Sequence, residues 1–98
     1  MKKRASAGGR ALPDGEWRVY IVRCADDSLY TGVAKDLDAR IARHNSGAGA
    51  RYTRGRLPVE LVYTERAENR SRAQCREAQI KKLTPAAKRA LIAQARGR

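Results

Sequence analysis

Residues 17–33, WRVYIVRCADDSLYTGV, contain the two segments that determine the fold. Residues 17–24 are rich in β-branched and aromatic side chains, and residues 29–33 have the same character, so both segments predict strands. The cluster ADDS at 25–28 between them is typical of a turn. Because so short a connection joins antiparallel strands, the stretch predicts a β-hairpin.

One tyrosine lies on each predicted strand, Tyr20 on the first and Tyr30 on the second. An even register across the turn places both side chains on one face of the sheet. Gly32 follows on the same parity, where a backbone or a ligand can approach closely. Tyrosines in strands are more often packing residues than reactive ones, and a phenol with a pKa of about 10 is a poor base at neutral pH. A nearby cation, or a metal-bound water that needs only a partial push, would change that.

A helix is expected after the hairpin, with Asp36 as its N-cap. Leu37, Ile41 and His44 follow at positions i, i+4 and i+7, which form one helical stripe, and the glycine-containing segment 45–49 ends the helix. His44 is either a cation favoured by the C-terminal end of the helix dipole or a hydrogen-bond partner of a tyrosine or a phosphate.

Two charged residues have both an ordinary and a functional interpretation. Arg40 is either a solvated helix charge or a fixed guanidinium that binds a phosphate in bidentate geometry. Glu77 lies at the edge of the stripe made by Ala73, Ile80 and Leu83 on a second predicted helix. Because an unpaired buried charge is costly, Glu77 needs either an ion pair with an arginine or an oxygen-preferring metal such as Mg²⁺ or Mn²⁺.

The rest of the chain supplies a third strand at 59–64 and two more helices. The first of these helices is capped by Ser71 and runs to Leu83. The next opens at Thr84 and Pro85, a cap followed by a helix-starting proline. The expected order is therefore β-β-α-β-α-α, which is an α+β fold.

Between the first helix and the third strand, residues 46–58 are predicted to form a glycine-rich, basic loop. Basic side chains can follow phosphates and an aromatic ring can stack on a base. A solvated loop is the ordinary interpretation of any single residue here. The residues that favour nucleic-acid binding are Arg51, Tyr52, Arg54 and Arg56.

Composition favours a polyanionic partner. The 98 residues, enough for one domain, hold 22 Lys and Arg against 10 Asp and Glu, and the net charge of +12 argues against a calcium-binding protein. Two cysteines and one histidine are too few for a disulfide framework or a structural zinc site. No apolar run approaches the ~20 residues of a membrane span and no secretory signal is present, so we expect a cytoplasmic protein.

The composition also predicts the boundaries of the domain. Residues 1–16 are expected to form a flexible basic leader, either a solvated tail or an electrostatic arm for phosphates. Residues 17–95 are expected to form the domain, followed by a basic tail at 96–98. We expect no second DNA-recognition domain, and no feature requires a protein partner.

Taken together, these residues resemble the GIY-YIG nuclease superfamily. The first motif appears as VYI at 19–21, preceded by Arg18 where the family has glycine. The second appears as YTG at 30–32, with threonine for the middle isoleucine. The resemblance covers roughly residues 17–84, and the ordered set is far more specific than any one motif. The chain is most similar to the small stand-alone bacterial members called YhbQ-like.

The helices extend the resemblance. Arg40 and His44 match the family's helix with its arginine and following histidine, and Glu77 occupies the place of the metal-binding glutamate. Asn45, next to His44, and a glycine-rich loop with Thr53 are similar to the nuclease domain of structure-specific eukaryotic endonucleases.

The resemblance implies a small three-stranded antiparallel sheet flanked by helices, and hydrolysis of DNA phosphodiesters with one divalent metal, Mg²⁺ or Mn²⁺. Glu77 would hold the ion and Arg40 would stabilise charge on the phosphoryl oxygens. One of the two tyrosines would orient and deprotonate the attacking water, and the choice between them stays open. The expected catalytic residues are Tyr20, Tyr30, Arg40, His44 and Glu77. The expected DNA contacts are Gly32, Lys35, Asn45, Arg51, Tyr52, Thr53, Arg54 and Arg56.

The leading hypothesis is therefore a metal-dependent DNA endonuclease of repair or recombination, structure-selective or non-specific, acting on branched or single-stranded DNA among other forms. The alternative is a non-catalytic nucleic-acid-binding domain that uses the same basic cleft. A third hypothesis is a membrane-surface or ribosome-associated protein, because Lys88 and Arg89 lie opposite Leu91 and Ile92 on the last helix. Core packing explains that helix better.

Overall fold

The computed structural model describes residues 16–97 of the chain. The predicted leader lies outside the described residues except for Glu16, and the predicted tail is described as far as Gly97. The elements, in order, are β1 (Trp17–Arg23), β2 (Leu29–Ala34), α1 (Leu37–Arg43), the π-helical turn η2 (His44–Ala48), α2 (Arg51–Arg54), β3 (Glu60–Ala67), α3 (Arg70–Lys81) and α4 (Pro85–Arg96).

The three strands form one antiparallel sheet in the order β2-β1-β3, so β1 is central and β2 lies at an edge. In the β1–β2 pair, Tyr20 lies opposite Gly32 and Val22 lies opposite Tyr30. Since side chains alternate between the faces, this register puts Tyr20 and Tyr30 on the same face. The predicted hairpin, its even register and the α+β class are all confirmed.

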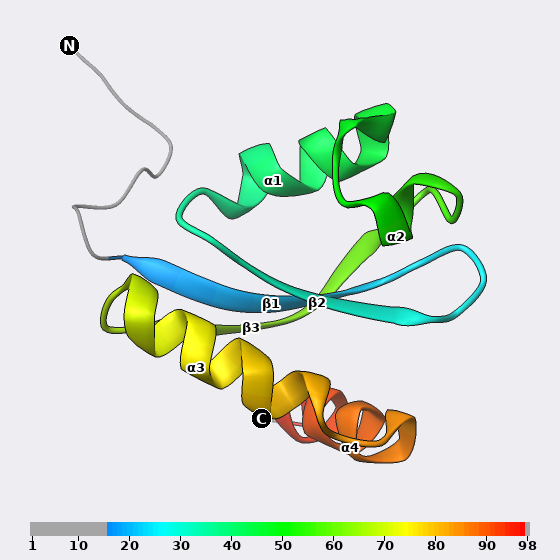
Figure 1. Cartoon of the computed structure of the whole chain (residues 1–98). Coiled ribbons are helices and arrows are strands. Elements are labelled where there is room, and N and C mark those ends of the chain that lie inside the picture. The colour runs from blue at the N-terminus through cyan, green and yellow to red at the C-terminus, as the bar shows by residue number, and fades with distance from the viewer. Residues whose placement is uncertain (1–15, 98) are drawn as a thin grey trace, which may run out of the picture.

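Each face of the sheet is covered by a pair of helices. Figure 1 shows α1 and α2 on one side of the sheet and α3 and α4 on the other. On the α3 side, Val19 and Ile21 of β1 pack against Ile80 and Ile92. On the α1 side, Tyr20, Val22, Cys24, Ala34 and Val59 form a second buried cluster. β1 is therefore buried on both faces, which explains its nearly continuous apolar sequence.

Two of the three predicted caps are observed. The Asp36 side chain accepts a hydrogen bond from the Ala39 backbone N–H, and Thr84 accepts one from Ala87, with Pro85 in the first helical turn. The prediction of Ser71 as the cap of the second long helix is wrong. Asn69 caps α3, because its side chain reaches the Arg72 N–H and completes the first turn two residues earlier.

Other boundaries also differ from those expected. β3 spans Glu60–Ala67 rather than 59–64, because its pairing with β1 runs from Glu60 to Ala67, with a register shift opposite Ile21 and Val22. The 46–58 segment is not all loop, since it contains the end of η2 and the single turn α2. No side chain caps α2, so the local sequence gives no start signal for it.

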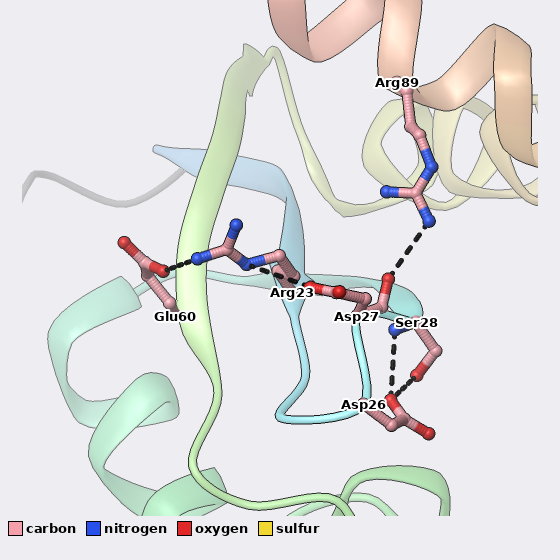
Figure 2. A network of polar contacts seen from close by, with 6 residues as sticks. All are labelled: Arg23, Asp26, Asp27, Ser28, Glu60 and Arg89. Carbon is pink, nitrogen blue, oxygen red and sulfur yellow. Dashed lines mark hydrogen bonds and ion pairs between the residues drawn. The ribbon is translucent and has the colours of Figure 1, made fainter.

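Polar contacts fix the β1–β2 turn to two other elements (Figure 2). Arg23 forms an ion pair with Glu60 of β3 at 2.6 Å, and Arg89 of α4 donates to the Asp27 carbonyl at 3.1 Å. The Arg89 bond holds the first half of α4 beside the hairpin, and the Arg23 ion pair joins the end of β1 to β3. Within residues 16–97, no helix is both long and apolar enough to cross a membrane.

Candidate active site

A chain of hydrogen bonds runs through the α1 side of the sheet. The Tyr20 hydroxyl lies 2.8 Å from His44 Nε2, and His44 Nδ1 lies 2.9 Å from Thr53 Oγ1. The Thr53 hydroxyl in turn donates to the Ala50 carbonyl at 2.9 Å. Because Thr53 has only one hydroxyl hydrogen, its oxygen must accept from His44. This assigns the proton to Nδ1 of a neutral His44, and leaves Nε2 to accept from Tyr20.

Burial holds both ring systems of this chain in their neutral forms. Tyr20 and His44 are each 1% exposed. Burial raises the pKa of Tyr20 to about 12, although the neighbouring Arg40 opposes that rise through its charge and a hydrogen bond. Burial, and then the Arg40 charge, lower the pKa of His44 below its usual value. At neutral pH, Tyr20 is therefore a proton donor and His44 a proton acceptor.

Two glycines make room for these side chains. A Cβ at Gly32 would lie 2.5 Å from the Tyr20 hydroxyl oxygen, so only glycine lets the Tyr20 side chain extend across β2. A Cβ at Gly49 would collide with the His44 ring. The close approach expected at Gly32 is real, but the approaching atom belongs to Tyr20. Gly32 itself is buried and makes room for the Tyr20 side chain, and its contact with DNA stays a prediction.

Arg40 and Tyr30 complete this side of the site. Arg40 projects from α1 and donates to the Val33 carbonyl at 3.3 Å, which places its guanidinium over the end of β2. The Tyr30 ring meets the His44 ring edge to face, with 5.6 Å between centroids. The structure thus brings three of the other four expected catalytic side chains, Tyr20, Tyr30 and Arg40, around His44.

The fifth, Glu77, comes from the opposite side of the sheet. Because β2 is an edge strand, side chains of α3 can extend past it towards the α1 face of the sheet. The Glu77 side chain is 22% exposed and its charge contributes to raising the pKa of Tyr20, so it lies within electrostatic range of the hydroxyl. Its partner is Lys81, at 3.4 Å, not the arginine that we considered.

Lys81 is a site residue that the sequence analysis missed. Its Nζ lies 5.7 Å from the centroid of the Tyr30 ring, as well as beside the Glu77 carboxylate. The available signal was its position four residues after Glu77 on one helix, where side chains are neighbours. Lys81 therefore connects the acidic residue of α3 to the aromatic face of β2.

The basic segment adds a second aromatic ring. Tyr52 stacks on Tyr30 with centroids 6.0 Å apart and 20° between the ring planes. The Arg56 guanidinium lies 4.0 Å from the Tyr52 ring centroid and also contacts Asp26 at 3.1 Å. Arg51 and Arg54 are exposed and available to a ligand.

The structure also places three more of the residues that we expect to contact DNA. Thr53 is 0% exposed and its hydroxyl is bonded to His44, and its contact with DNA stays a prediction. Asn45 is hydrogen-bonded through both side-chain amide atoms to the backbone of Val59, so its amide joins two segments of the protein. Lys35 is exposed, and its Nζ lies 5.8 Å from the centroid of the Trp17 ring.

The donor set near Tyr20 suits one kind of metal. Among residues 16–97, no three or more His, Cys, Asp or Glu side chains cluster to hold an ion. A partly exposed carboxylate such as Glu77 nevertheless fits Mg²⁺ or Mn²⁺, because such ions keep several waters and use one or two carboxylates plus substrate phosphates. The residues present therefore fit a weakly held oxygen-ligated ion.

Comparison with known proteins identifies the family of this chain. A family model described as the GIY-YIG catalytic domain matches residues 16–90. A UPF0213 protein of Natronomonas pharaonis is 51% identical over 79 residues, which cover 81% of this chain and 93% of that protein. A UPF0213 protein of Clostridium perfringens is 58% identical over 74 residues, covering 76% of this chain and 80% of that protein.

A solved structure is also similar. The solution NMR structure of a UPF0213 protein from Bacillus halodurans has a TM-score of 0.53 and 42% identity, and covers 81% of this chain and 84% of that one. The resemblance inferred from the two tyrosine motifs is thus confirmed. With its paired motif tyrosines on one face of a three-stranded sheet, this chain belongs to the GIY-YIG catalytic-domain family and to its UPF0213 branch.

Proposed function

We propose that the protein is a divalent-metal-dependent endonuclease that hydrolyses phosphodiester bonds in DNA. We further propose that it is structure-selective or non-specific and acts in repair or recombination. The observation that carries the proposal is the meeting of Tyr20, Tyr30, Arg40 and His44 on one face with Glu77 at its edge. A cation, a carboxylate and phenols around one point are the groups that phosphodiester hydrolysis needs.

Each side chain has a role in the proposed reaction. Arg40 is exposed on α1 and would stabilise the negative charge that grows on the phosphoryl oxygens. Glu77 would hold Mg²⁺ or Mn²⁺, and such an ion polarises the phosphate and lowers the pKa of water. Lys81 would have to release Glu77 when the ion binds. His44 would fix the direction of the Tyr20 hydroxyl.

The two tyrosines differ in their access to water. Tyr20 is almost fully buried, donates its proton to His44 and has a pKa of about 12, so it is poorly suited to take a proton from water. Tyr30 is only half-buried and lines an open groove. We therefore assign the orientation of the attacking water to Tyr30, and the positioning of the site to Tyr20 and His44.

A cleavage assay tests the proposal. Branched, nicked, single-stranded and duplex DNA would be incubated with the protein in Mg²⁺, in Mn²⁺ and in a chelator. Metal-dependent cutting that Glu77→Gln abolishes and Glu68→Gln retains is expected, because Glu68 is an exposed glutamate paired with Arg72, outside the site. Binding without cutting on every substrate would instead favour the non-catalytic nucleic-acid-binding domain.

A further inference from the structure

A groove follows the free edge of β2 away from the active site. It consists of two hollows of about 390 and 360 Å³ that share Leu29, Tyr52 and Lys88. One wall comes from β2 and the Tyr52 ring, and the other from the start of α4. Tyr30 and Lys81, both beside the active site, also line this groove. The groove therefore continues the active site rather than forming a separate pocket.

The groove is built for an anion. Lys81, Lys88 and Arg89 line it, and among the described residues no acidic side chain does. Lys88 is half-buried, and its backbone N–H bonds the Thr84 carbonyl, yet its side-chain ammonium makes no hydrogen bond or ion pair with any residue of 16–97. Arg89 is held by the Asp27 carbonyl, as Figure 2 shows, so this wall keeps a fixed position beside the hairpin.

A second observation points to a missing hydrogen-bond partner. Thr31 is 2% exposed and lines the same groove. Its Oγ1 is the one buried side-chain polar atom of residues 16–97 without a hydrogen bond. Buried polar groups are nearly always satisfied, so an orphan beside an open, cationic groove indicates a ligand that supplies the partner.

We propose that this groove binds a backbone phosphate of the DNA strand next to the phosphate that is cut. The inference rests on the proposed function and adds the path of the strand. From the active site the strand passes the β2 edge, where Lys88 pairs with the flanking phosphate. The Thr31 hydroxyl donates to an oxygen of the same nucleotide. The fourth helix thus has a binding role beyond the core packing that the sequence predicted for it.

The test measures binding in a chelator, so that no cutting occurs. Fluorescence anisotropy would compare the wild type, Lys88→Gln and the control Arg72→Gln. The control removes the same charge from an exposed residue in the first turn of α3. Oligonucleotides would carry one methylphosphonate at successive positions, since this removes one phosphate charge at a time. We expect Lys88→Gln alone to weaken binding by about tenfold and to make the salt dependence shallower by about one unit. A methylphosphonate at one position should weaken DNA binding by the wild type but should not weaken it further in Lys88→Gln.

Thr31→Val keeps the test valid if a charge change perturbs the fold. It removes an unsatisfied hydroxyl at nearly constant shape, so thermal stability should stay the same or rise while DNA binding weakens. Equal binding by Lys88→Gln and Arg72→Gln, or methylphosphonate penalties that persist in Lys88→Gln, would overturn the inference. If the protein cuts DNA but binding is insensitive to Lys88, only this inference fails. If binding depends on Lys88 and on one phosphate but nothing is cut, the nuclease proposal fails, and the groove stays a phosphate site on the path of a bound strand.

Discussion

Both faces of the sheet are buried, but the side chains on one face are mainly apolar and those on the other form a polar chain. On the α3 side, Val19, Ile21 and Ile80 pack as hydrocarbon against hydrocarbon. On the α1 side, Tyr20, His44 and Thr53 are just as buried, and each polar atom has a partner in one continuous chain. One face supplies stability through burial, and the other holds polar groups in fixed directions and protonation states. A 98-residue chain can carry a buried polar site because the other face is apolar.

The largest effect on stability should come from the apolar face. Ile21 is 0% exposed, so Ile21→Ala should lower the free energy of unfolding by about 2–5 kcal/mol, measured by urea denaturation. Leu61→Ala on β3, where the side chain is 38% exposed, is the matched control and should cost far less. Similar losses in both variants would contradict the view that this face carries most of the stability.

The polar face should show its largest effect in turnover rather than in stability. Arg40→Ala should reduce kcat by about 10²–10³-fold while the Kd for DNA changes little, because its charge is needed mainly in the transition state. Arg43→Ala, an exposed arginine of the same helix, should leave kcat near the wild-type value. Equal losses of DNA binding and turnover in Arg40→Ala would contradict the transition-state role assigned to Arg40.

A single atom removed from the polar chain should have a measurable cost. Tyr20→Phe leaves His44 Nε2 buried without a donor, so the free energy of unfolding should fall by about 1–3 kcal/mol. Tyr52→Phe, at a partly exposed ring, should be nearly neutral. Nitrogen NMR of the wild type should find the His44 proton on Nδ1, and a proton on Nε2 would refute the assigned direction of the chain.

The smallest expected effect is the contribution that His44 and Tyr20 of the polar face make to the dependence of stability on pH. The folded-state pKa of His44 lies below its usual 6.5, so the unfolded chain takes up a proton first as the pH falls. The contribution of His44 to the free energy of unfolding is therefore full above pH 6.5. It declines below that pH and levels off beneath the folded-state pKa. Tyr20 acts oppositely, since its contribution is full below pH 10 and is lost as the pH rises towards about 12.

Urea midpoints measured across these two ranges would check both signs. His44→Gln should make the acidic decline shallower, and Tyr20→Phe should make the alkaline decline shallower. A wild-type midpoint that rises below pH 6.5 would contradict the lowered pKa of His44.

Local chemistry explains which features the sequence could predict. The hairpin, the Asp36 cap and the Thr84–Pro85 start depend on neighbouring residues, so their patterns are visible in the chain itself. The family motifs likewise identified Tyr20 and Tyr30, and the even register that places them together follows from the short turn.

Contacts between distant segments explain what was missed. Thr53 looked like a loop residue, because nothing near it in sequence shows that it meets His44 nine residues away. The turn α2 lacks a capping side chain and depends on such tertiary contacts. Lys81 looked like an ordinary helix charge until β2 was placed at the sheet edge above it.

The double hydrogen bond between Asn45 and Val59 has a consequence for protein engineering. The Asn45 amide donates to the Val59 carbonyl at 3.1 Å and accepts from the Val59 N–H at 2.7 Å. The residues on either side of the 46–58 segment are thus bonded directly to each other. A segment closed at its base can be exchanged for a loop of another sequence or length while the sheet stays intact. A graft would need to keep Thr53, which orients His44, Gly49, which makes room for its ring, and Tyr52, which stacks on Tyr30.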